Sequence, residues 1–426
     1  MNILILCIFV LGYAGIAFEH QLRINKAATA LVTGVLCWTV YILFVPDKEM
    51  VGTQLSIHLG DLSQILFFLL GAMTIVELID AHDGFEIITS RIKTTQKRKI
   101  LWIVSILAFF LSAILDNLTT SIVMVSLVRK LVADKNDRWI LAGAIIIAAN
   151  AGGVWSPIGD VTTTMLWIGN QITAANIIMK LFIPGVICLL VPLMILRFSF
   201  NGQFAKPFAV QEIGGETPST NKERIIVFVT GVMVLLMVPV FKTITHLPPF
   251  MGILLGLGLM WMITETIHSN KDEEDRKQFT VTYDLRKIDT ASVLFFLGIL
   301  LAISALEATG QLHHAATWMD DHLKNQNTIG LSIGLLSAVV DNVPLVAATQ
   351  GMYGLDVYPT DHYFWELLAY TTGTGGSILI IGSAAGVAAM GIEKIDFIWY
   401  LKKIGWLALV GYLAGAAFYI FQHQLF

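Results

Sequence analysis

The sequence predicts an all-α polytopic membrane protein, an inverted repeat of five transmembrane helices plus one re-entrant hairpin each, with broken helices at mid-membrane. Three observations predict this fold. Of the 426 residues, 56% are hydrophobic and 14% are charged, whereas soluble domains carry about 25% charged residues. Apolar runs recur along the whole chain. The dipeptide Asp-Asn stands near the middle of two of these runs, at 116–117 and at 341–342.

Ten apolar runs have the length that a transmembrane helix needs, about 17 residues or more. The first run has neither a basic start nor a cleavage site typical of a signal peptide, so we expect it to be retained as a span. The ten predicted spans are 2–18, 27–45, 62–80, 139–168, 176–197, 225–241, 249–268, 290–308, 362–391 and 396–422.

The two runs that carry Asp-Asn, 100–131 and 329–353, are predicted to be re-entrant hairpins. Each of their arms has only about 12–16 residues, which is too short to cross a hydrocarbon core of ~30 Å. Irregular backbone at that depth is tolerated where it is buried in protein or lines an aqueous cavity. The alternative is a pair of short full spans joined by an exposed Asp-Asn turn.

The basic residues predict the orientation. This threading places all but four of the 27 Lys and Arg residues on one side of the membrane, which the positive-inside rule makes the cytoplasmic side. The first hairpin then enters from the cytoplasm and the second from outside, and both termini are extracytoplasmic. The four exceptions are Lys48, Lys180, Lys242 and Lys324.

The two halves repeat one another. Gly152-Gly153 and Gly159 recur as Gly375-Gly376 and Gly382. The first repeat is predicted to occupy 1–197 and the second 225–426, joined by a cytoplasmic linker at 198–224. Because each half has an odd number of spans, the second copy must be inverted. Secondary transporters with this architecture bind their substrate at the interface of the repeats.

Buried carboxyl groups mark the candidate site. A carboxylate at the bilayer centre costs roughly 2.5–3.5 kcal/mol on insertion scales, so it is usually retained for an ion or proton path. A glycine pair and a proline also break the run 139–168, and a stretch rich in glycine and threonine breaks the run 362–391. Such breaks free backbone carbonyls to bind a cation. The candidate carboxyl groups for proton and cation coupling are Asp116, Asp341, Asp160, Glu77 and Glu307.

Neutral oxygen donors accompany these acids at the hairpin tips and helix breaks. Amide, hydroxyl and carboxylate oxygens suit a hard cation such as Na⁺ or Li⁺. The candidate cation-binding residues are Asn117, Thr119, Asn150, Ser156, Thr162, Thr163, Asn342, Thr372 and Ser377.

Structural roles remain open for several of these residues. The three aspartates could be paired and inert, and Asp160 could support a ligand rather than bind the cation itself. Glu77 and Glu307 could be interfacial acids that reach water. Thr162 and Thr163 could simply cap a restarted helix.

The motifs Asp-Asn-Leu-Thr-Thr at 116–120, Asn-Ala-Gly-Gly-Val-Trp-Ser-Pro-Ile-Gly-Asp-Val-Thr-Thr at 150–163 and Asp-Asn-Val-Pro at 341–344 resemble those of NhaD-type Na⁺/H⁺ antiporters of the ion transporter superfamily. The resemblance covers about residues 60–390. It implies export of Na⁺ or Li⁺ in exchange for protons, a homodimer and the inner membrane of a bacterial cell. By match to the motifs, it also implies that the ion path is formed by Asp116, Asn117, Thr119, Asn150, Ser156, Asp160, Thr162, Thr163, Asp341 and Asn342. Of these we expect Asp116, Asn117, Asn150, Asp160, Asp341 and Asn342 to be the ligands of the cation.

Related dicarboxylate transporters have serine at the hairpin tips where this chain has aspartate. Two or three carboxylates would repel a dianionic substrate in a medium of low dielectric constant. The leading hypothesis is therefore an antiporter in which Na⁺ and H⁺ compete for the same carboxyl groups, with no cofactor. The alternative is an anion transporter for dicarboxylate, citrate or arsenite.

Other classes of function are disfavoured. A membrane enzyme would need a nucleophile–base pair or a metal cluster, and the sequence shows neither pattern. A channel would not require an inverted repeat with two hairpins. The small net charge of −4 gives no sign of a nucleic-acid partner, so the expected partners are the transported ions, membrane lipid and a second copy of the chain.

Overall fold

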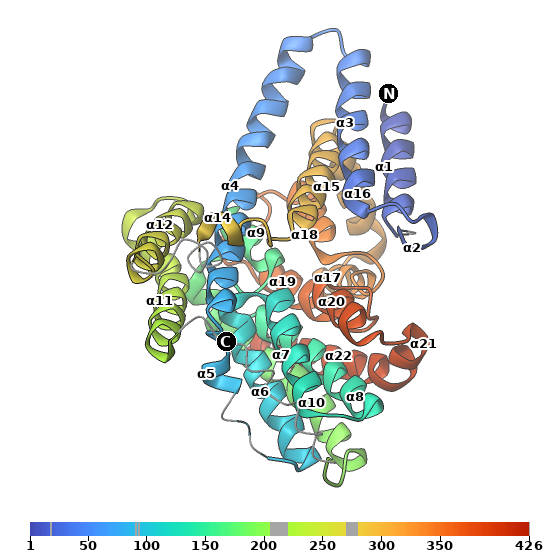
Figure 1. Ribbon diagram of the computed structural model, residues 1–426. Coiled ribbons are helices and arrows are strands. Elements are labelled where there is room, and N and C mark those ends of the chain that lie inside the picture. The colour runs from blue at the N-terminus through green and yellow to red at the C-terminus, as the bar shows by residue number, and fades with distance from the viewer. Residues whose placement is uncertain (18, 90–91, 93, 205–219, 270–279, 426) are drawn as a thin grey trace.

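The computed structural model describes residues 1–17, 19–89, 92, 94–204, 220–269 and 280–425, so most of the predicted linker 198–224 lies outside the described residues. The regular elements of this described part are helices, which confirms the predicted all-α class (Figure 1). Eight of the helices are long and apolar enough to cross a membrane. Additional shorter helices, and helices interrupted in the middle, lie between them.

The N-terminal part begins with α1 (Asn2–Ala17), α2 (Glu19–Leu22), α3 (Lys26–Phe44), α4 (Lys48–Ala81) and α5 (Glu86–Thr89). Helix α4 has 34 residues and is therefore ~51 Å long, so it begins well before the predicted span 62–80. Its start is set by Asp47, whose side chain accepts a hydrogen bond from the Met50 amide. No proline follows that would end the helix before Ala81.

The two Asp-Asn segments are each a helix, a turn and a second helix. The first consists of α6 (Lys97–Leu115) and α7 (Asn117–Leu131), which meet at Asp116. The second consists of α17 (Gln326–Leu336) and α18 (Asn342–Met352). Helix α6 has 19 residues, or ~28 Å, so the predicted arm length of 12–16 residues is wrong for this arm. The helix extends back through three basic residues, 97–99, at its solvent end.

Two helices are interrupted at their glycines. Helix α8 (Lys135–Gly153) ends before a turn at 154–160 and resumes as α9 (Val161–Ile168). Helix α19 (Tyr363–Gly375) ends before a turn at 376–383 and resumes as α20 (Ala384–Glu393). A Cβ atom on Gly152 would lie 2.1 Å from the Phe109 carbonyl oxygen, and one on Gly375 would lie 2.0 Å from that of Gly334. Glycine therefore lets α6 pack against α8, and α17 against α19, at backbone distance.

Hydrogen bonds repeat at these two contacts. Ser112 Oγ donates to the Ala149 carbonyl at 2.6 Å, and Ser337 Oγ donates to the Thr372 carbonyl at 2.6 Å. In both cases the serine lies in or directly after the first helix of an Asp-Asn segment, and the acceptor lies shortly before a break. The two Asp-Asn segments are thus anchored to the two broken helices by the same type of contact.

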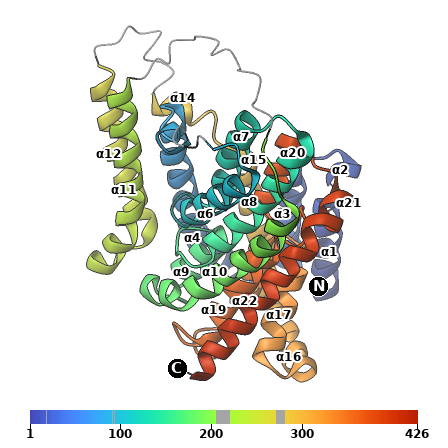
Figure 2. The ribbon, with the colours of Figure 1, turned by 90° about the horizontal axis from the view of Figure 1, so that it is seen from below.

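The remaining helices pack around the two Asp-Asn segments and the two broken helices. They are α10 (Ala174–Ser199), α11 (Asn221–Thr245), α12 (Pro249–Ile267), α14 (Val281–Asp284), α15 (Thr290–Ala308), α16 (Gln311–Leu323), α21 (Phe397–Tyr400) and α22 (Trp406–Leu425). Helix α3 packs along α15, and α12 packs along α4. Seen from below, the pair α11–α12 and the helix α1 lie on opposite sides of the molecule (Figure 2). Helix α10 packs along α22 near the centre.

We expect Gly375→Ala to lower the apparent melting temperature of the purified protein in detergent. The added methyl group would overlap the Gly334 carbonyl oxygen, and overpacking of this kind costs about 1–3 kcal/mol. The matched control is Gly258→Ala in α12, where an added Cβ has no neighbour within 4 Å. Unchanged melting of Gly375→Ala would show that the close packing of α17 on α19 is not required.

Candidate cation site

Asp160 lies at the start of α9 and is 2% exposed. Its Oδ1 accepts hydrogen bonds from the Thr162 amide at 2.9 Å and from Thr162 Oγ1 at 2.8 Å. The Asp160 amide donates to Thr163 Oγ1, which completes a capping box. The helix break therefore places this carboxyl group in the protein interior, where the two threonines orient it.

The first residues of α7 and α18 meet at Asp160. Asn117 Nδ2 donates to Asp160 Oδ2 at 2.6 Å, and Asn342 Nδ2 lies 3.4 Å from both carboxyl oxygens. Asn117 Nδ2 also lies 3.1 Å from Asn150 Oδ1. Residues from both Asp-Asn segments and from the first helix break are thus in one buried cluster.

Asn150 connects this cluster to the second helix break. Its Nδ2 donates to Ser377 Oγ at 2.8 Å and to Ser383 Oγ at 3.0 Å. Ser383 begins α20 and accepts a hydrogen bond from the Gly386 amide, which is the role that Asp160 has at the start of α9. The polar network therefore crosses between the two halves of the chain through side chains alone.

Asp116 and Asp341 cap the two helices that begin with the asparagines. Asp116 has a backbone φ of +90°, which is uncommon for a residue other than glycine. Its carboxyl group accepts from the Thr119 amide at 2.8 Å and from Thr119 Oγ1 at 3.0 Å. The Asp341 carboxyl group accepts from the Val343 amide at 3.2 Å. Each aspartate thus satisfies the amide groups of its own helix start.

One internal cavity connects the three aspartates, and we call it the inner cavity. Asp116, Asp160 and Asp341 all line it, together with Asn117 and Asn342, and it has room for water over about 60 Å³. Among the described residues, no three Asp, Glu, His or Cys side chains are close enough to hold a metal ion together. The three carboxyl groups therefore border a common space without forming a single ligand set.

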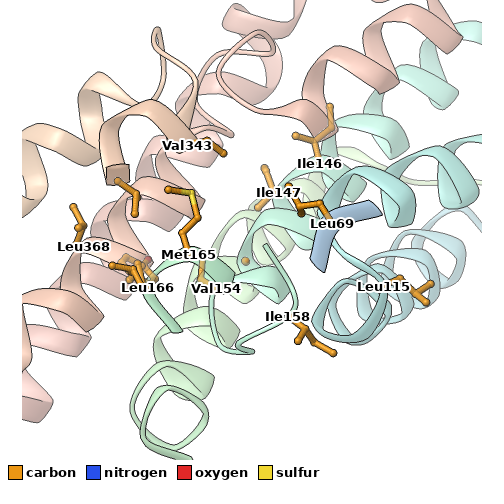
Figure 3. Close-up of a cluster of buried hydrophobic side chains, with 14 of the residues drawn as sticks. Leu69, Leu115, Ile146, Ile147, Val154, Ile158, Met165, Leu166, Val343 and Leu368 are labelled. Atoms are coloured by element: carbon orange, nitrogen blue, oxygen red, sulfur yellow. The ribbon is translucent and has the colours of Figure 1, made fainter. Parts of the chain in front are cut away.

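Apolar side chains enclose the inner cavity. Leu69, Leu115, Ile158 and Val343 line it directly. Figure 3 shows these four residues with Val154, Met165 and Leu166, which extend the apolar surroundings. Such surroundings lower the local dielectric constant, so charges in the cavity interact more strongly than they would at a surface.

A family model described as "Citrate transporter" matches residues 13–375 of the chain. Sodium/proton antiporter 1 of Arabidopsis thaliana is 49% identical over 420 residues, which cover 98% of this chain and 72% of that protein. Sodium/proton antiporter 2 of the same plant is 44% identical over 98% of this chain and 99% of its own length. The Na(+)/H(+) antiporter NhaD of Vibrio cholerae is 30% identical over 99% of this chain and 92% of its own length.

The chain belongs to the citrate transporter family. Within it, the chain groups with the NhaD-type antiporters, as its motifs predicted. In this family member the three motifs meet at the inner cavity, through residues 116–117, 150–163 and 341–342.

Several residues singled out from the sequence lie away from the inner cavity. Ser156 accepts from the Ile158 amide within the first break, and Thr372 Oγ1 donates to the Leu368 carbonyl of its own helix. Glu77 lies 3.6 Å from Lys287 Nζ. Glu307 lines a second cavity together with His58 and Asp61.

The helices that line this second cavity, which we call the outer cavity, are four of those that also line the inner cavity, namely α4, α9, α15 and α18. Helix α4 contributes Leu69 to the inner cavity and Ile65 to the outer one, and α15 contributes Phe296 and Leu300 in the same way. Helices α9 and α18 also line both. A separation of four residues is about one helical turn, or ~5–6 Å. The two cavities are therefore stacked along these helices, with apolar side chains between them.

Sequence reasoning missed Lys26 as a site residue and assigned it to the cytoplasmic surface. It lines the inner cavity, and its Nζ lies 3.9 Å from Asp341 Oδ2. Its position as the first residue of α3 could have indicated an anionic partner. A cation at a helix N-terminus opposes the helix dipole, so an anionic partner from another element was to be expected.

We expect Asn150→Ala to destabilise this family member more than an average surface substitution does. The change removes the Asn150 donor from the buried Ser377 and Ser383 hydroxyls. Ser383 keeps the Gly386 amide as a donor, so the larger loss is at Ser377, and an unsatisfied buried group costs about 1–3 kcal/mol. The apparent melting temperature in detergent measures the effect. The control is Asn201→Ala, which removes an exposed amide that donates to the Phe198 carbonyl. Equal melting of the two variants would contradict the connecting role of Asn150.

Proposed function

We propose that this protein is a secondary antiporter that exchanges Na⁺ or Li⁺ for H⁺ across a membrane. The observation that carries the proposal is the inner cavity, where Asp116, Asp160 and Asp341 border one space together with two asparagines. The relatives named sodium/proton antiporters match the chain over nearly its whole length, which supports the same choice of substrates.

The helix starts at the inner cavity favour a cation over an anion. A helix N-terminus attracts anions through its free amide groups and its dipole. Here the N-termini of α7, α9 and α18 are each capped by a carboxyl group of the chain itself, from Asp116, Asp160 and Asp341. The positions that an anionic substrate would use are therefore already filled, and the cavity carries the charge that a cation needs.

The alternative of an anion transporter has two observations in its favour. The matching family model is described as a citrate transporter, and Lys26 lines the inner cavity. Against it, Lys26 is the one basic side chain among the described residues that line this cavity, and it is paired with Asp341. The remaining two carboxylates would repel a di- or tricarboxylate.

We further propose that the fold is an inverted repeat in which the two Asp-Asn segments are re-entrant hairpins. The paired contacts Ser112–Ala149 and Ser337–Thr372 support this proposal. So does the packing of α3 along α15, which mirrors that of α12 along α4. In this arrangement the first repeat is 1–197 and the second is 225–426, and both termini are extracytoplasmic. The protein would act in the cell membrane as a homodimer, as the family resemblance implies.

Exchange follows from competition for the same carboxyl groups. A proton neutralises a carboxyl group, whereas Na⁺ requires its charged form, so each ion displaces the other. In the state described here, Asn117 and Asn342 direct their amide nitrogens toward Asp160. Rotation of an amide group would exchange its nitrogen for its oxygen, and the two asparagines would then donate oxygen ligands to a bound cation. Asp116 and Asp341 supply the nearby charge, while Thr119 and Thr162 keep the carboxyl groups in place.

The decisive experiment uses the purified protein in liposomes with an acidic lumen and an internal pH dye. Added NaCl or LiCl should alkalinise the lumen, whereas choline chloride and choline citrate should not. Asp116→Asn, Asp160→Asn and Asp341→Asn should each lower the rate at least ~10-fold, a loss that even supporting residues of metal sites show on mutation. Movement of citrate without a response to Na⁺ would replace the antiporter by the anion transporter.

The matched control for these variants is Asp47→Asn. Asp47 also caps a helix, by accepting from the Met50 amide, but it is exposed and far along α4 from the cavity. Asparagine caps a helix about as well as aspartate does, so this variant should exchange ions at the wild-type rate. A loss of exchange in Asp47→Asn would show that the assay responds to capping and not to the charge of the site.

Glu77 and Glu307 should behave differently from the three aspartates. Both lie outside the inner cavity, so we expect Glu77→Gln and Glu307→Gln to keep Na⁺-driven exchange and to change its apparent KM for Na⁺ or its rate by less than ~10-fold. The same liposome assay, run over a series of Na⁺ concentrations, separates the two parameters. Complete loss of exchange in either variant would place that glutamate among the essential coupling groups.

A further inference from the structure

The ammonium group of Lys26 lies between an acid and an aromatic ring. Its Nζ is 3.9 Å from Asp341 Oδ2 and 4.5 Å from the centre of the Phe295 ring. The start of α3 is held in place by two contacts, since Asn25 caps the helix and the Lys26 amide donates to Glu19 Oε1 at 3.1 Å. The lysine is thus presented to Asp341 from a fixed backbone position.

A third cavity lies on the far side of this ion pair from Asp116 and Asp160, and we call it the vestibule. It has room for water over about 420 Å³ and is lined by Tyr13, Glu19, Phe295 and Met390, among others. Lys26 and Asp341 are the two residues, within the described part of the chain, that line both the vestibule and the inner cavity. The ion pair therefore forms the boundary between the two spaces.

The contact at this boundary is loose. The side chains of Lys26 and Asp341 are 28% and 20% exposed, and their 3.9 Å separation exceeds that of Lys97 and Asp137, which is 2.6 Å. A partly hydrated ion pair at this distance is weak, so another monovalent cation can replace the ammonium group at the carboxylate. The Lys26–Asp341 contact can therefore break and re-form, unlike a tightly packed, permanent ion pair.

We propose that Lys26 is a tethered cation that competes with the transported cation for Asp341 and closes the passage between the vestibule and the inner cavity. The proposal rests on the antiport function above. The ammonium group and Na⁺ carry the same charge, so one carboxylate cannot hold both at full strength. When Na⁺ arrives from the vestibule, it displaces Lys26 from Asp341. When Na⁺ leaves, Lys26 returns, neutralises Asp341 and restores the boundary.

The predicted topology indicates which side of the membrane the Lys26–Asp341 boundary faces. Glu19 at the start of α2, Lys26 at the start of α3 and Lys394 after α20 fall on the cytoplasmic side according to the distribution of basic residues. The vestibule lies among these elements. Lys26 would then control loading from the cytoplasm. The outer cavity with Glu307, on the other side of the apolar side chains, would face the extracytoplasmic space.

The test compares Lys26→Met with the wild-type protein in the same liposomes, with Na⁺-dependent thermal stabilisation in detergent as a second readout. Removing the competitor should lower both the apparent KM for Na⁺ and the Na⁺ concentration for half-maximal stabilisation, by about 2- to 5-fold. Lys26→Arg keeps the charge and should stay near the wild-type values. Lys26→Gln is the second neutral variant, for use if Lys26→Met does not fold.

The matched control is Lys97→Met. Lys97 also pairs with an aspartate and faces aromatic rings, those of Phe200 and Phe204, but it does not line the inner cavity or the vestibule. It should therefore leave the apparent KM for Na⁺ unchanged.

The outcomes separate the two proposals. If the wild-type protein responds to Na⁺ and the neutral Lys26 variants have the wild-type KM, competition by Lys26 is refuted and the antiporter stands. If the neutral variants bind Na⁺ more weakly, or lose exchange while Lys97→Met keeps it, Lys26 assists the cation and the proposal is wrong. If the wild-type protein shows no response to Na⁺ in either readout, both proposals fall together.

Discussion

Four helices begin at the centre of this protein, and their free amide groups must be satisfied away from bulk water. A helix start leaves its first amide groups without partners in the helix, and an unpaired polar group is costly in an apolar environment. The chain meets this requirement with Asp116, Asp160, Asp341 and Ser383 at the starts of α7, α9, α18 and α20. Three of the four caps are carboxyl groups, so the groups that satisfy the free amides also bring negative charge together at the centre.

The surrounding polar residues follow from that cluster. Asn117 and Asn342 direct donors at Asp160, and Asn150 carries the network to Ser377 and Ser383. Both oxygens of Asp160 already accept hydrogen bonds, so a cation at this group would have to share it with the protein. The Asp341 carboxyl group is more accessible to a cation, because its Oδ2 lies 3.9 Å from Lys26 Nζ, which is too far for a hydrogen bond. The three aspartates are therefore not equivalent, although they have the same capping role.

Lys26 also shows a limit of counting basic residues along a membrane protein. The count assigned Lys26 to the cytoplasmic side, but it could not show that the side chain turns toward Asp341. An ammonium group beside Asp341 reduces the net charge of the inner cavity. This lowers the electrostatic cost of keeping three carboxyl groups near one another in surroundings of low dielectric constant.

The sequence by itself determined the all-α class, the two helix breaks and the positions of the buried acids, because each depends on local chemistry. A pair of glycines weakens a helix at its own position in the chain, and a charged residue in a long apolar run is conspicuous without any partner. Proline alone is a weaker sign, because Pro184 and Pro192 stand inside the continuous helix α10. It also identified Asp116, Asp160, Asp341 and their asparagines as candidates. It gave Glu77 and Glu307 as further candidates that could instead be interfacial acids. In the structure Glu77 lies near Lys287 and Glu307 lines the outer cavity, and neither lines the inner cavity.

Only the tertiary structure decided which of these groups meet. Asn342 and Asp160 are 182 residues apart in the chain, and periodicity along a helix says nothing about which face of it a distant helix will cover. The same reason explains why the Lys26–Asp341 pair and the stacking of the inner and outer cavities were not foreseen. Such contacts depend on how closely helices approach, and here the approach depends on glycines such as Gly152 and Gly375, where a side chain would collide with the neighbouring backbone.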